Sequence, residues 1–342
     1  MDKGPIFILG CSKSGTSLLR NLFDGHPDFF VIPAESHFFQ NIGYWVNYYT
    51  RRARPRKLCF EEMKKELLRW IDYSNLQENT LADGFTAGKW NIDNFKATLT
   101  SKKVSSLRDL SDLYIASMYA SVYNKPIKEE LRFIEKSVEN AEFAFDWLRL
   151  YPNAKFIHIL RNPYSNIVAF RKFYDPKKFT SLKAVIYSMY NSYYFLYKNS
   201  GLINEDQYKI VIYEDLIKNP EKTMKDLSDF AEIQFSDILL APTILGKLWS
   251  GNSTSGVSFS GISAINVEKW KKEISSFEIG VVNELFAHVV EDFGFERIKS
   301  KKSLMRFAKG ENISDYIENR WFYYNMPRFG KDRKAKRHQV AF

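Results

Sequence analysis

The sequence predicts an α/β protein with three layers, in which helices flank a central, mostly parallel β-sheet. Two observations support this class: short, continuous apolar runs, and helical patterns that separate several of them. Such runs, rich in Ile, Val and Phe, are typical of strands that are buried on both faces of a parallel sheet. Their alternation with helices is typical of βαβ units, and 342 residues are enough for one large domain of this kind.

The predicted elements follow one another along the chain in that alternating order. The predicted strands are Ile6–Leu9, Phe29–Ile32, Leu131–Ile134, Phe156–Leu160 and Ile210–Tyr213. The predicted helices are Thr16–Phe23, Ser106–Tyr123, Ala141–Leu150, Pro163–Phe173 and Leu182–Lys198. Gly25 is a favourable residue just after a helix and Pro27 prevents continuation, so the first helix should end there. Residues 38–125 carry mostly helical patterns, such as Phe60–Tyr73, and predict a helical insertion into the sheet.

Composition and charge limit the class of protein. Apolar residues make up 45% of the chain, which predicts a packed globule and excludes a disordered one. We expect one domain over residues 1–300 and an extension over residues 301–342, which includes a basic tail at Arg328–His338. A flexible, solvated tail is the favoured interpretation, with an anchor to polyanions as the alternative. The other basic stretch, Arg51–Lys57, is expected to be a solvated loop.

Several absences suggest where the protein works. The two cysteines, Cys11 and Cys59, cannot form a disulfide framework, which favours a reducing compartment. Residues 1–10 have the pattern of a strand and lack that of a signal peptide. No stretch approaches the roughly 18 apolar residues that a membrane span needs. The sequence therefore predicts a soluble, cytoplasmic protein, and its net charge of +10 favours an anionic partner without selecting one.

A polar turn, GCSKSGTS, lies between the first predicted strand and helix at residues 10–17. Free N–H groups at a helix start attract anions, and Gly10 and Gly15 let the backbone approach a phosphate closely. The two glycines have the spacing of the nucleotide-triphosphatase loop G-x-x-x-x-G-K-[ST], but Thr16 occupies its lysine position and Lys13 comes early. A Mg–triphosphate enzyme would lack a phosphate contact, so we expect a phosphate loop of a different kind.

Two segments at predicted strand–helix junctions are KSGTSLL (Lys13–Leu19) and KFIHILRNPYSNIVAF (Lys155–Phe170). They resemble the 5′-phosphosulfate loop and the 3′-phosphate motif of sulfotransferases that use 3′-phosphoadenosine 5′-phosphosulfate (PAPS). Four further segments match in the expected order: ESHFF (Glu35–Phe39), FIEKSVEN (Phe133–Asn140), VIYEDL (Val211–Leu216) and the Gly/Ser-rich loop with its W-K-K-E helix (Gly251–Ser275). The resemblance covers about residues 5–295 and is nearest to the carbohydrate and tyrosylprotein type of bacterial branch. It implies a P-loop-like nucleotide-binding core, with PAPS as cosubstrate and 3′-phosphoadenosine 5′-phosphate (PAP) as product.

The resemblance also implies which residues bind the cosubstrate. They are Lys13, Ser14, Gly15, Thr16, Ser17, Arg161, Tyr213, Ser253, Ser258 and Gly261. Tyr213 would lie near the adenine, although a core position is the alternative, and Gly/Ser content in the late loop also fits simple flexibility. The family usually has a serine at the position of Ala169. Because Ser165 lies one turn earlier on the same helix face, we expect Ser165, or its neighbour Asn166, to replace part of that contact.

Sulfuryl transfer from PAPS to a hydroxyl acceptor needs a general base and a cation at the leaving phosphate. The resemblance implies Glu35 as the base, with His37 as the alternative, and Lys13 at the leaving group. Lys136 would lie near the transferred group. Alternatively, Glu35 is a carboxylate at a helix start, and Lys136 is a surface lysine paired with Glu135 or Glu139. No metal is expected, because the five histidines are scattered and neither cysteine has a partner at ligand spacing.

The predicted function is therefore in-line sulfuryl transfer from PAPS to a hydroxyl or amine acceptor. A carbohydrate is the favoured acceptor, and a lipid, a peptide or a small molecule remains an alternative. Aromatic residues such as Phe38, Phe39, Tyr44 and Trp45 would line an acceptor cleft or, more often, a helix core. Two other functions stay open: a P-loop kinase or nucleotide hydrolase, and a basic protein that binds polyanions. Nucleic acid is not the expected partner, and the sequence does not indicate an oligomeric state.

Overall fold

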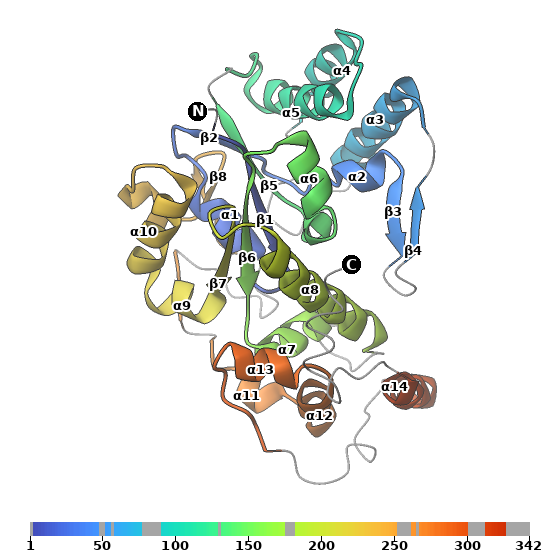
Figure 1. Ribbon diagram of the computed structural model, residues 1–342, viewed down its shortest axis with the longest axis vertical. Coiled ribbons are helices and arrows are strands. Elements are labelled where there is room, and N and C mark those ends of the chain that lie inside the picture. Colours follow the sequence, from blue (N-terminus) through green and yellow to red (C-terminus); the bar gives the residue numbers. More distant parts are fainter. Residues whose placement is uncertain are drawn as a thin grey trace.

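The computed structural model describes residues 3–47, 52–55, 58–76, 90–128, 131–174, 182–251, 261–264, 267–299 and 312–325. Its central sheet consists of β1 (Ile6–Gly10), β2 (Phe29–Val31), β5 (Arg132–Lys136), β6 (Lys155–Leu160) and β7 (Tyr208–Ile212). The spatial order is β2-β5-β1-β6-β7, and every neighbouring pair is parallel (Figure 1). The predicted parallel α/β class is confirmed.

Alternating side chains of β1 reach the two faces of the sheet. Ile6 and Ile8 pack in one buried cluster with residues of α1 (Thr16–Leu22) and α10 (Pro220–Ala231). Phe7 and Leu9 pack in another with residues of α5 (Leu107–Tyr123) and α6 (Ala144–Leu150). Figure 1 shows α1 and α10 on one side of the sheet and α6 on the other. Helices on both faces complete the three predicted layers.

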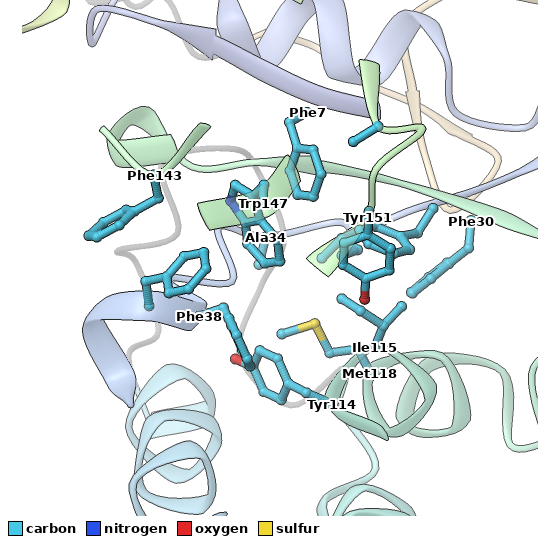
Figure 2. Packing of buried hydrophobic residues seen from close by; sticks show 14 of the residues in the cluster. Phe7, Phe30, Ala34, Phe38, Tyr114, Ile115, Met118, Phe143, Trp147 and Tyr151 are labelled. Atoms are coloured by element: carbon cyan, nitrogen blue, oxygen red, sulfur yellow. The ribbon is translucent and has the colours of Figure 1, made fainter. Parts of the chain in front are cut away.

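An aromatic cluster fills the face of the sheet that α5 and α6 cover (Figure 2). The Phe7 ring stacks on Trp147 with centroids 4.4 Å apart, and Trp147 also contacts Phe38 at 5.5 Å. Phe38 in turn lies 5.9 Å from Tyr114 of α5. Phe38 and Phe39 are both 2% exposed, so they belong to this core and do not line an open acceptor cleft.

Two predicted strands have wrong boundaries because pairing with a neighbour extends them. The run Leu131–Ile134 continues as β5 through Glu135 and Lys136, which pair with Phe7 and Ile8 of β1. The run Ile210–Tyr213 begins earlier, since Tyr208 pairs with Phe156 of β6. Tyr213 is not in this strand but starts the next helix, α9 (Tyr213–Lys218).

The predicted helices all form, although the helix predicted over Leu182–Lys198 continues to Leu202 and one other segment divides. The segment Ala141–Leu150 divides into a 3₁₀ turn, η1 (Val138–Ala141), and α6. The other helices of the sheet layers are α7 (Pro163–Tyr174) and α8 (Lys183–Leu202). Later in the chain come η2 (Asp237–Leu240), the strand pair β8 (Thr243–Ile244) and β9 (Lys247–Leu248), and the helices α11 (Trp270–Glu273), α12 (Ser276–Leu285), α13 (Ala287–Asp292) and α14 (Ile313–Asn325).

The insertion over residues 38–125 is largely helical, as predicted, but it also contains a hairpin. Its helices are α2 (Phe38–Asn41), α3 (Phe60–Leu76), α4 (Ile92–Thr100) and α5. Strands β3 (Tyr44–Asn47) and β4 (Arg52–Pro55) pair antiparallel, so the expected solvated loop at Arg51–Lys57 is wrong over Arg52–Pro55. Charge alone predicted a loop, whereas pairing with β3 determines the strand, and Pro55 is tolerated at the end of a two-stranded ribbon.

Two further observations concern the cysteines and the length of the apolar helices. Cys11 is buried and Cys59 is exposed, and neither forms a disulfide. Burial raises the pKa of the Cys11 thiol to about 12, so it is an inert thiol at neutral pH. In the described part of the chain, no helix has the length and apolar character needed to cross a membrane.

Candidate active site

Each strand of the sheet ends at the same edge, and each is associated there with a residue that the sequence singled out. Lys13 follows β1, Glu35 follows β2 and Lys136 ends β5. Arg161 follows β6, and Tyr213 follows β7. The carboxyl edge of a parallel sheet is where α/β proteins bind ligands. The topology therefore brings these five side chains, from residues 13 to 213, to one edge of the sheet.

The predicted phosphate loop has a tight, left-handed backbone. The Ser14 N–H donates to the Cys11 carbonyl oxygen at 3.1 Å. Lys13 has a φ of +64°, and Gly15, which caps the start of α1, has a φ of +104°. A Cβ atom on Gly15 would lie 2.4 Å from Cδ2 of Tyr213. Glycine is therefore required here both for the backbone conformation and for the close approach of the tyrosine ring.

The β6–α7 junction holds the loop from the side. Nη1 of Arg161 donates to the Lys13 carbonyl oxygen at 2.9 Å, and Nδ2 of Asn166 donates to the Ser12 carbonyl oxygen at 2.9 Å. Nε of Arg161 donates to Oγ of Ser165, also at 2.9 Å. The structure thus brings Arg161 and Ser165 together beside the loop, as the sequence predicts, and gives Asn166 a supporting contact.

The polar groups of this cradle fit an anionic ligand. Oγ of Ser14 is buried and has no hydrogen-bond partner among the described residues. Within the same residues, the two hydrogen bonds of Arg161 use Nε and Nη1, so its Nη2 remains available. The Arg161 guanidinium lies 4.7 Å above the Tyr213 ring, and Nζ of Lys13 lies 4.1 Å from the Phe173 ring centroid. Two cations and an unpaired buried hydroxyl therefore surround the turn.

The remaining predicted cosubstrate residues are less informative. Thr16 and Ser17 are buried at the start of α1. A Cβ atom on Gly261 would meet no atom within 4 Å, so packing does not require glycine there. Ser253 and Ser258 lie outside the described residues.

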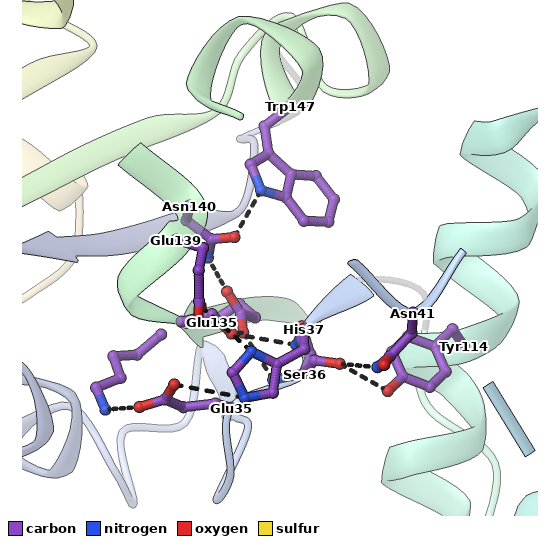
Figure 3. Close-up of polar contacts among 11 residues, drawn as sticks. Glu35, Ser36, His37, Asn41, Tyr114, Glu135, Glu139, Asn140 and Trp147 are labelled. Carbon is purple, nitrogen blue, oxygen red and sulfur yellow. Dashed lines mark hydrogen bonds and ion pairs between the residues drawn. The ribbon is translucent and has the colours of Figure 1, made fainter. Parts of the chain in front are cut away.

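A second cluster lies at the ends of β2 and β5 (Figure 3). Glu35 forms an ion pair with Lys136, whose side chain is 4% exposed. His37 lies between two carboxylates, with Nε2 3.6 Å from Oε2 of Glu35 and Nδ1 3.2 Å from Oε2 of Glu139. Lys136 is therefore not the surface lysine of the alternative interpretation, because its side chain is buried against Glu35.

The carboxylates control the charge of His37. Burial by itself lowers the pKa of this imidazole, but Glu139 and Glu35 outweigh that effect and raise it to about 9. His37 is therefore protonated at neutral pH, and an imidazolium cannot accept a proton. Its backbone is also left-handed, with a φ of +46°, which is uncommon for a residue other than glycine.

Glu135 fixes the backbone beneath this cluster. It is fully buried, and its carboxylate accepts hydrogen bonds from the Ser36 N–H at 3.0 Å, from Oγ of Ser137 at 2.6 Å and from Nδ2 of Asn140. Nε1 of Trp147 donates to Oδ1 of Asn140 at 3.0 Å, which links the network to the aromatic core. Burial raises the pKa of Glu135, and the donors around its carboxylate oppose that effect.

The turn at Ser36 is held on its other side as well. Its carbonyl oxygen accepts hydrogen bonds from the Tyr114 hydroxyl at 2.9 Å and from Nδ2 of Asn41 at 3.1 Å. The His37 N–H donates to Oγ of Ser137 at 3.2 Å. The backbone between Glu35 and His37 is therefore fixed by contacts from three separate elements.

Sequence reasoning did not assign roles to Glu135 and Glu139. Both lie in the FIEKSVEN segment that the resemblance singled out, but they were considered only as partners of Lys136. The alternation of side chains between the two faces of a strand could have separated the roles of Glu135 and Lys136. Because Lys136 and Glu135 are adjacent on β5, they point to opposite faces of the sheet and cannot share one partner site.

The structure also brings together a group that the scattered histidines did not predict. The ligand-type atoms of Glu35, His37 and Glu139 lie within 4.8 Å of one another. Sequence reasoning, which considered only the spacing of histidines and cysteines, missed this group. A cation bound here would have to replace the proton on His37, since a histidine ligand must be neutral.

Comparisons with known proteins agree with this fold. A model of the sulfotransferase family matches residues 5–237, which contain both clusters. The sulfotransferase domain of the Synechococcus PCC 7002 olefin synthase is similar in structure, with 21% identity, coverage of 86% of this chain and 96% of that domain, and a TM-score of 0.50. The sulfotransferase domain from the curacin biosynthetic pathway shows 19% identity, coverage of 86% and 99%, and a TM-score of 0.53. No curated protein matched the sequence. With more than half of its length matched by the family model, this chain belongs to the sulfotransferase family.

Proposed function

We propose that this protein transfers a sulfuryl group from PAPS to an acceptor hydroxyl by direct, in-line displacement. One observation carries the proposal: the parallel sheet brings a phosphate loop backed by Arg161 and an acid–base cluster containing Glu35 to the same edge. Sulfuryl transfer needs a site for an anionic leaving group and a nearby group that accepts the acceptor's proton.

At the donor end, the loop N–H groups and Lys13 would hold the 5′-phosphosulfate. Arg161 and Ser165 would hold the 3′-phosphate, for which the Nη2 group of Arg161 is available. Arg161 also keeps the loop in place through the Lys13 carbonyl oxygen. Preorganised donors of this kind stabilise charge on a leaving phosphate without having to reorient during the reaction.

At the acceptor end, we assign the general base to Glu35 in preference to His37. The pKa of about 9 leaves His37 protonated at neutral pH, whereas Glu35 is a partly exposed carboxylate. His37 would instead orient Glu35 from one side while Lys136 orients it from the other. Lys136 would also lie near the sulfuryl group as it moves between the two oxygens.

The bonds balance without a further reactant. The acceptor oxygen forms a bond to sulfur, the bond between sulfur and the bridging phosphate oxygen breaks, and its electron pair stays on the PAP phosphate. The acceptor proton passes to Glu35 and then to solvent. The products are a sulfate ester, PAP and one proton.

The acceptor that we propose to test first is a carbohydrate hydroxyl. The support is the ESHFF and EKS segments, which resemble the carbohydrate branch of the family and form the Glu35–His37–Lys136 cluster. Lipids, peptides and small molecules that carry a hydroxyl group are the next classes to test.

The decisive experiment is nucleotide binding followed by transfer. Thermal stability is measured with PAP, with ADP, and with ATP plus Mg²⁺, because a ligand of the folded state raises stability by mass action. We expect PAP to stabilise far more than ADP, equally with and without EDTA. Transfer is then measured with sulfur-labelled PAPS against a panel of glycans, lipids, peptides and small molecules that carry hydroxyl groups.

Other outcomes would favour other functions. Stabilisation only by ATP with Mg²⁺ would support a P-loop kinase or nucleotide hydrolase and contradict our proposal. Salt-sensitive binding to polyanions with no response to any nucleotide would support a basic binding protein. Loss of the PAP response in EDTA would show that nucleotide binding needs a metal, for which Glu35, His37 and Glu139 are a candidate group among the described residues.

A further inference from the structure

One face of helix α14 packs against the described part of the protein, and large apolar side chains on the opposite face are exposed. Asn319 and Phe322 are buried at 1% and 2% exposure, and the Phe322 ring lies 4.8 Å from Tyr187 of α8. Oδ1 of Asn319 accepts a hydrogen bond from the Leu182 N–H at 2.7 Å just before α8. These contacts fix the orientation of α14 at the edge of the molecule (Figure 1).

The opposite face of α14 carries a stripe of large apolar side chains in water. Ile313, Ile317 and Trp321 are 78%, 59% and 61% exposed. Their i, i+4, i+8 spacing puts them on one side of the helix, turned away from Asn319 and Phe322. Ile313 is the most exposed large apolar residue in the described part of the chain. Ile317 lies one turn further along the helix and Trp321 two turns, and more than half of each side chain is also exposed.

The sequence around this stripe holds most of the protein's net charge. Residues 297–342 contain thirteen Lys or Arg and four Asp or Glu, a net charge of +9, whereas the whole chain carries +10. The basic residues lie mainly on both sides of the helix, at 297–309 and 328–337. An exposed apolar stripe is thus flanked along the chain by two basic segments.

We propose that the exposed face of α14, which we name the α14 stripe (Ile313, Ile317 and Trp321), docks on the surface of a membrane that contains anionic lipids. Ile and Trp side chains enter the boundary between headgroups and acyl chains, and flanking basic residues are attracted to anionic headgroups. Each contribution alone is weak, and stable membrane binding takes two signals. This chain combines both within 46 residues.

Charge favours a membrane over the other possible occupants. A second copy would bring two segments of net charge +9 together, and like charges oppose that association. A purely polyanionic partner would explain the basic residues but not the exposed Ile and Trp side chains. The proposal is independent of the sulfotransferase reaction, since it uses no residue of either cluster.

The test is co-sedimentation of the full chain with vesicles of phosphatidylcholine alone and of phosphatidylcholine with phosphatidylglycerol. We expect binding only to the anionic vesicles, weakened by salt. Replacing both Ile317 and Trp321 by glutamine keeps good helix propensity and should lower the partition coefficient about tenfold or more. The matched control is Leu248→Gln, because Leu248 is also 61% exposed but lies on β9.

Each alternative has a distinct result. Equal binding of the Ile317→Gln/Trp321→Gln variant and the native chain would show that charge alone attracts the protein and would overturn the proposal. So would absence of binding to anionic vesicles. A native dimer that this variant separates, detected by sedimentation velocity without vesicles, would make the α14 stripe a self-association surface. Thermal melting of both variants checks that the fold is intact.

Discussion

The two ends of the candidate site differ in how they are built. The donor end is a turn of the backbone, held by two side chains of the β6–α7 junction and surrounded by the cations Lys13 and Arg161. At the acceptor end, only His37 has a left-handed backbone, and the carboxylates of Glu35 and Glu139 are paired with the Lys136 ammonium and the His37 imidazolium. The two ends are therefore suited to different steps of the reaction. Cations at a fixed turn suit an anion that must bind and leave, whereas paired charges suit a proton that must move.

The largest effect should come from Glu35→Gln at the acceptor end. Glutamine keeps the size of the side chain but cannot accept the proton, so turnover should fall about a thousandfold. PAP binding, measured by calorimetry, should not change because the donor end is untouched. Turnover within a few-fold of the native rate would remove Glu35 as the base and return that role to another group.

At the donor end, Arg161→Ala should weaken PAP binding by about 10- to 100-fold, since it removes charge-assisted hydrogen bonds to phosphate. Part of the loss arises from the loop, which no longer has its contact at the Lys13 carbonyl oxygen. Arg161→Lys is the informative control, because it keeps the charge but not the paired donors. If calorimetry gave the native dissociation constant for the alanine variant, the 3′-phosphate assignment would be wrong.

A smaller effect, on turnover alone, is expected for Glu135→Gln. The amide replaces one acceptor oxygen by a donor facing Nδ2 of Asn140, so the turn that carries Glu35 and His37 should loosen. We expect kcat to fall about tenfold with little change in KM for PAPS. Glu278→Gln is the matched control: Glu278 is also a fully buried carboxylate, bonded to Arg171, and its loss should lower stability without lowering kcat.

The two ends were also unequally predictable from the sequence. The loop, its glycines and Arg161 lie in short motifs at strand–helix junctions, where local pattern and backbone chemistry determine the structure. Glu35, His37 and Lys136 were identified by resemblance, but their pairing was not. Contacts such as Glu35–Lys136 join residues 101 positions apart and depend on β2 lying beside β5, which no local pattern specifies.

The same limit explains the errors in the fold. The hairpin β3–β4 was missed because Arg52–Pro55 has no apolar alternation, and only its partner strand makes it a strand. Glu135 was overlooked because a charged residue at a strand end is usually solvated. Here hydrogen bonds from Ser36, Ser137 and Asn140 allow its burial.

A several-fold weakening of PAP binding is expected for Ser165→Ala. Oγ of Ser165 accepts a hydrogen bond from Nε of Arg161, so the variant loses an orienting contact and a hydroxyl, but not the charge. Ala169→Ser is the complementary variant, since it restores the hydroxyl at the position that the family usually uses. If it recovers the loss in the Ser165→Ala background, the two hydroxyls serve the same phosphate. An unchanged dissociation constant for Ser165→Ala would leave that contact to Arg161 alone.

The smallest effect concerns pH and belongs only to the acceptor end. The pKa of His37 rises from 6.5 to about 9 on folding, because Glu139 and Glu35 favour its charged form more than burial opposes it. The resulting stabilisation is complete below pH 6.5 and is lost as the pH rises toward 9. In the His37→Asn variant, asparagine tolerates the left-handed backbone and cannot ionise. The melting temperature of this variant should therefore not show the fall that the loss of the His37 proton causes in the native protein. Between pH 6.5 and pH 9, the difference in melting temperature between the native protein and the His37→Asn variant should shrink by a few degrees. Parallel curves would show that His37 is neutral throughout, which would restore it as a candidate base beside Glu35.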